Sequence, residues 1–156
     1  DGSTALAGTL TEPLDLGAGA RGGDTFVAAF APSGAPRWSH GILDDDGVVT
    51  IGALLFDDEG NTFVGGSFTE TMALGGESHV AKGASDGFVA KIRPDGAIAW
   101  TRTLVNGQAA AVRGLAFDGD GAIVAVGDFV GDLSLGGETV LSGTTGSDLF
   151  AMGFQP

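Results

Sequence analysis

Three copies of one short phrase, 62 residues apart, constrain the fold of this chain more than any other feature. The copies begin at Asp24 (Asp-Thr-Phe-Val-Ala), Asp86 (Asp-Gly-Phe-Val-Ala) and Asp148 (Asp-Leu-Phe-Ala-Met). Similarity at one long, fixed period is the signature of a repeat architecture, in which each unit packs against its neighbours. We therefore expect residues 1–156 to form a single region of repeated units, without a separate domain or linker.

The repeat continues beyond this phrase. Three further pairs of residues recur 61 or 62 positions apart: Pro32 and Pro94, Trp38 and Trp100, and Leu54 and Leu115. These pairs divide the chain into a partial unit (1–58), a full unit (59–119) and a partial unit (120–156). Because terminal repeats need neighbours or caps, we expect a piece of a longer chain, or a chain whose broken units another copy completes.

Every regular segment has the pattern of a β-strand. Apolar and other side chains alternate over runs of five to eight residues, such as 86–92, 98–104 and 122–129, and Gly, Pro or Asp bounds each run. The Pro-Ser-Gly (32–34) and Pro-Asp-Gly (94–96) segments predict turns in which Gly takes the left-handed conformation. No window combines a helix cap with an amphipathic stripe. The longer Gly/Ser/Thr loops at 75–85 and 136–147 leave room for a short extra strand. The sequence predicts an all-β fold of consecutive four-stranded antiparallel units, each about 60 residues long, in a partial ring or array.

The combined motif resembles a known family. Its first half is Asp-x-Phe-Val-Ala-Lys-x-x-Pro-x-Gly-x-x-x-Trp from Asp86. Its second half is Leu-x-Phe-Asp-x-x-Gly-x-x-x-Val-x-Gly-x-Phe from Leu54, and the copy from Leu115 has Ala125 in place of the Val. Together they are similar to the bacterial β-propeller repeats of secreted and cell-surface proteins, in particular the seven-bladed type. The resemblance implies propeller-type blades and an extracellular or cell-surface location. The chain departs from the family in its longer loop after Leu-Gly-Gly and in having fewer than three full units.

Composition excludes several classes of partner and site. The formal net charge of −13 leaves no cationic surface for nucleic acid or anionic lipid. The chain has no cysteine, so it can form neither disulfides nor thiolate metal sites. It also has no apolar run long enough for a transmembrane helix.

Two acidic turns are candidate calcium sites. Asp57 and Glu59 in one unit, and Asp118 and Asp120 in the next, place carboxylates at alternate positions beside a glycine, as in abbreviated calcium loops. Neither turn offers a full ligand set, so we favour tight hairpin turns in which Asp binds its own backbone. The expected cofactor is therefore none, with calcium as the alternative. A third acidic loop at 44–46 is expected to be a solvated tip.

The remaining candidates have structural and functional interpretations. For the repeated Asp at positions 24, 86 and 148 we favour a loop anchor that accepts backbone N–H groups. Trp38 and Trp100 suit sugar stacking if they are exposed, but their phase with apolar neighbours favours packing between units. For the same reason we expect the Phe residues at 26, 88 and 150, and at 56 and 117, to be core residues. We expect His40 and His79 to be ordinary surface or loop residues.

These observations favour a non-catalytic structural or binding module of a secreted or surface-exposed bacterial repeat protein, acting in self-association or adhesion. Its expected partners are other copies, flanking repeats or glycans. One alternative is a carbohydrate-binding, lectin-like propeller. The other is a fragment of a propeller enzyme whose active site lies elsewhere.

Overall fold

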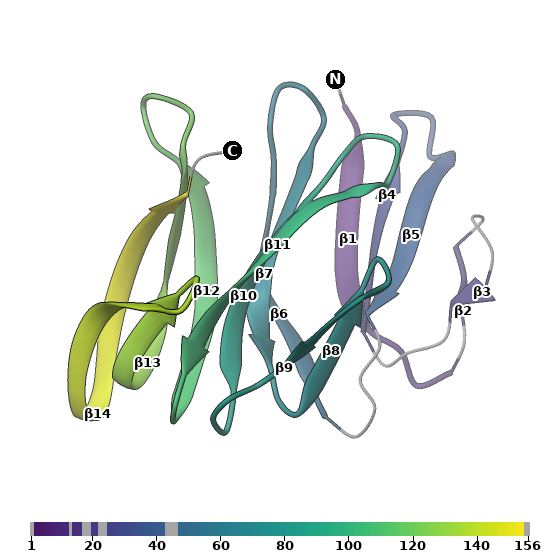
Figure 1. The fold of residues 1–156 in the computed structure, drawn as a ribbon. Coiled ribbons are helices and arrows are strands. Elements are labelled where there is room, and N and C mark those ends of the chain that lie inside the picture. Colours follow the sequence, from purple (N-terminus) through teal and green to yellow (C-terminus); the bar gives the residue numbers. More distant parts are fainter. Residues whose placement is uncertain (1, 13, 17–19, 22–24, 43–46, 155–156) are drawn as a thin grey trace.

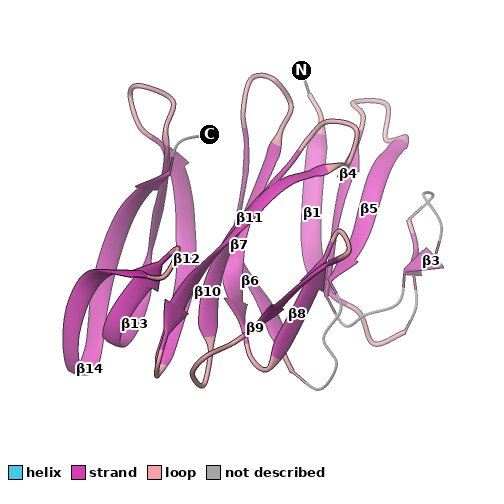
Figure 2. Ribbon diagram, viewed as in Figure 1, coloured by secondary structure: helices cyan, strands magenta, loops and turns pink. Residues whose placement is uncertain are grey.

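The computed structural model describes residues 2–12, 14–16, 20–21, 25–42 and 47–154. The regular structure of these residues consists of strands alone, which confirms the predicted all-β fold class (Figure 2). No helix of the described part of the chain is long and apolar enough to cross a membrane. The strands lie in three antiparallel groups, arranged side by side (Figure 1).

The first group contains β1 (Thr4–Thr9), β4 (Thr25–Phe30) and β5 (Pro36–Ile42), paired in that order. Its register places Leu6 opposite Ala28, and Ala28 opposite Ser39. The chain between β1 and β4 includes a hairpin of β2 (Leu14–Asp15) and β3 (Ala20–Arg21). All pairings in this group join strands that follow closely along the chain.

The middle group contains β6 (Val49–Phe56), β7 (Thr62–Phe68), β10 (Asp86–Ile92) and β11 (Ile98–Asn106), again paired in chain order. A hairpin of β8 (Thr71–Leu74) and β9 (Glu77–Val80) connects β7 to β10. Because β9 lies within residues 75–85, it confirms the short extra strand predicted there.

The last group contains β12 (Ala109–Phe117), β13 (Ile123–Leu135) and β14 (Glu138–Phe154). Residues 104–106 of β11 also pair with residues 133–135 of β13, so the middle and last groups form one seven-stranded sheet. The sequence predicted consecutive four-stranded units, and this continuity was not foreseen. It arises because β13 runs on through Gly131 (φ 80°), whereas the corresponding chain separates into β7 and β8 near Glu70 (φ 51°).

Matching turns join β4 to β5 in the first group and β10 to β11 in the middle group. The Ala31–Ala35 and Arg93–Ala97 turns each close with a backbone hydrogen bond between their end residues, of 2.8 and 2.9 Å. Gly34 and Gly96 occupy the same position in the two turns, with φ of 81° and 89°. This is the left-handed conformation predicted for glycine in the Pro-Ser-Gly and Pro-Asp-Gly turns.

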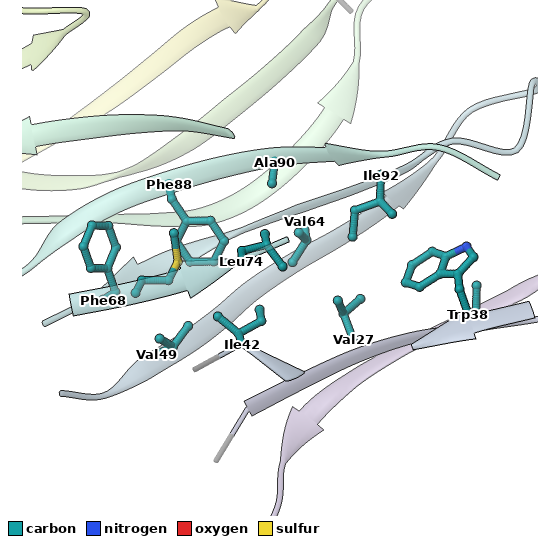
Figure 3. Packing of buried hydrophobic residues seen from close by; sticks show 12 residues of the cluster. Val27, Trp38, Ile42, Val49, Val64, Phe68, Leu74, Phe88, Ala90 and Ile92 are labelled. Carbon is teal, nitrogen blue, oxygen red and sulfur yellow. The ribbon is translucent and has the colours of Figure 1, made fainter. Parts of the chain in front are cut away.

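Two apolar cores lie between the groups, and the middle group contributes to both. Val64 and Phe88 face the first group, where Val27 and Trp38 pack against them (Figure 3). The adjacent residues Phe63 and Val89 face the last group, where they meet the second core. Strand alternation thus gives the middle group two apolar faces. The Phe residues predicted to be core at 26, 88 and 150 are buried.

Candidate functional site

The two acidic turns have the same internal geometry. The Asp57 Oδ1 atom accepts hydrogen bonds from the backbone N–H groups of Glu59 (3.0 Å) and Asn61 (2.8 Å). The Asp118 Oδ1 atom accepts the equivalent bonds from Asp120 (2.9 Å) and Ala122 (2.8 Å). These bonds satisfy turn N–H groups that the strand ladder leaves unpaired, so they confirm the predicted role of Asp in the turns.

The two turns also line one cleft, of about 660 Å³, because they connect the first two strands of neighbouring groups. Phe56 and Phe117, the residues before each turn, are half-buried and supply apolar surface to the cleft, rather than lying fully in the core. Of the four candidate calcium ligands, Asp57, Glu59 and Asp118 line the cleft. Asp120 belongs to the second turn but is not among the lining residues.

The cleft also has a cationic lining residue. Lys91 also lines the cleft, and its Nζ atom is 5.4 Å from the ring centre of Phe63, its cross-strand neighbour. The negative face of the ring attracts the ammonium group. The cleft therefore combines carboxylates, one ammonium group and phenyl rings, a set that suits a polar ligand with an apolar face.

The hydrogen bonds within the first turn occupy carboxylate oxygens that a calcium ion would need. The Asp57 Oδ2 atom accepts a hydrogen bond of 2.6 Å from the Asn61 amide, so both oxygens of this carboxylate already have donors. Across the described residues, no three His, Cys, Asp or Glu side chains are grouped to hold a metal ion. The calcium alternative stays a prediction that a binding experiment must decide.

The Asp residues of the repeated phrase do anchor loops. The Asp86 carboxylate is fully buried and accepts a 3.0 Å hydrogen bond from the Lys82 backbone N–H. The Asp148 carboxylate accepts bonds from the backbone N–H (2.7 Å) and hydroxyl (3.2 Å) of Thr144. The predicted structural role is thus confirmed at both positions. Asp24 and the acidic loop at 44–46 lie outside the described residues.

Trp38 is a core residue. Its side chain is 6% exposed and packs in the first core, as the packing interpretation predicted (Figure 3). The turn of the middle group lies directly against it, because a Cβ atom at Gly96 would be 2.7 Å from the Trp38 Cβ atom. In this conformation the indole ring is not available as a platform for a sugar.

Trp100 occupies the equivalent position in the middle group but is only half-buried. It packs against the second core, with its ring centre 6.3 Å from that of Phe63. The Arg102 guanidinium lies 5.1 Å from the centre of the indole ring. A ligand-binding role for Trp100 stays a prediction.

The role of His40 could not be predicted from the sequence. Its Nε2 atom lies 2.7 Å from the carbonyl oxygen of Gly96, and its ring is 5.6 Å from that of Trp38. His40 therefore joins the first group to the middle group, and the prediction of an ordinary surface residue was wrong. His40 lies on β5, opposite Val27 of β4. The turn that contains Gly96, to which His40 binds, belongs to the next unit, so its contact could not be predicted from the strand pattern of one unit. Lys91 was missed for the same reason, since its cleft is formed by two units.

A scan against models of known protein families finds no match for this chain, and a search of curated proteins finds no similar sequence.

Proposed function

We propose that this chain is a non-catalytic structural and binding module, built from propeller-type blades of a secreted or surface-exposed bacterial repeat protein. It acts by self-association or adhesion. Location and blade type rest on the resemblance of the repeated motif to bacterial propeller repeats. The pairing of β6, β7, β10 and β11 in chain order supports the assignment of blades.

One observation carries the proposal: the strand groups are held together by apolar faces, and the two outermost faces still expose apolar side chains. Val64 and Phe88 are covered by the first group, and Phe63 and Val89 by the last group. On the outward faces of the described strands, Leu6 in β1 and Leu149 in β14 are 42% and 85% exposed. Burial of such side chains stabilises association by about 25 cal/mol per Å² of apolar surface before the costs of binding are subtracted.

Self-association can be measured directly. Sedimentation velocity over a wide range of protein concentrations should give a sedimentation coefficient that rises with concentration. Because the chain carries a net charge of −13, higher salt should strengthen association by screening repulsion. A well-folded protein that sediments as a monomer at every concentration and salt level would contradict this function.

The cleft between the acidic turns favours carbohydrate binding as a second candidate function. Its carboxylates and Lys91 can exchange hydrogen bonds with hydroxyl groups, and Phe56 and Phe117 present apolar surface to a sugar ring. A glycan array probed with the wild type and with Lys91→Met tests this function. Binding that the substitution removes would support it, and an array without signal would exclude it for the glycans tested.

A further inference from the structure

We draw no further inference here: the strongest candidate, the cleft between the Asp57 and Asp118 turns, belongs to the site already described, and the excess of carboxylates over Lys91 in its lining does not by itself identify a ligand.

Discussion

The Nε2 atom of His40 lies 2.7 Å from the carbonyl oxygen of Gly96, so an imidazole of the first group binds a turn of the middle group. A carbonyl oxygen only accepts, so Nε2 carries the proton and donates it. The same turn packs on Trp38, whose ring lies 5.6 Å from that of His40. Contact between the two groups is therefore concentrated where one short turn meets two aromatic side chains.

Gly96→Ala should destabilise the protein strongly. The new methyl group would lie 2.7 Å from the Trp38 Cβ atom, at a backbone φ of 89°. Gly34→Ala is the control, because Gly34 has a φ of 81° in the matching turn and nothing within 4 Å of an added Cβ. Thermal unfolding should show a loss of about 1 kcal/mol for the control from backbone strain, and about 2–4 kcal/mol for Gly96→Ala. Equal losses would mean that contact with Trp38 contributes nothing.

The two tryptophans should differ in their contribution to stability. Trp38→Ala removes a buried ring from the first core and should lower the free energy of unfolding by about 3–5 kcal/mol. Trp100→Ala should cost roughly half as much, because the half-buried side chain removes less apolar surface from water. Denaturant titration of both variants measures the difference. A larger loss at Trp100 would contradict the burial seen here.

The loop anchors should rank by burial. Asp86→Ala removes a fully buried carboxylate that accepts the Lys82 N–H and should cost about 1–3 kcal/mol. Asp148→Ala should cost only about 1 kcal/mol, because solvent can replace the bond to the Thr144 N–H. Asp86→Asn keeps an acceptor oxygen and should recover part of the loss. Chemical denaturation at neutral pH compares the three variants, and full stability of Asp86→Ala would argue against the anchor role.

Asp57→Ala and Asp118→Ala separate the turn role from calcium binding. Each removes the acceptor of two backbone N–H groups, so each should lower stability by about 1 kcal/mol in EDTA. If the carboxylates act only within the turns, added calcium should leave the melting temperature of the wild type unchanged. A rise with calcium that is lost in either variant would establish a metal site instead.

Features confined to one repeat unit could be predicted from the sequence. Strand alternation identified the core Phe88 and Phe150, and the Pro-x-Gly signal identified the left-handed Gly34 and Gly96. The bonds made by Asp86 also follow from local chemistry, because its N–H partner lies only four residues away.

Features formed between units could not be predicted in the same way. The contact of His40 with Gly96 spans 56 residues, and Lys91 faces two turns from different groups. The period of the repeat shows which residues are equivalent in different units. It does not give the orientation in which one unit packs against the next. The junction of β11 with β13 likewise depends on how far β13 extends beyond its usual length.

The assignment of Phe63 and Val64 to opposite cores has a consequence for misfolding. These neighbours lie on one strand, and each is fully buried on its own side of the middle group. A shift of β7 by one residue against its partners would move the phenyl ring into the space of the smaller side chain on one side and leave a void on the other. Such an error would damage both cores together, so the middle group penalises mispairing more heavily than a sheet with one solvated face.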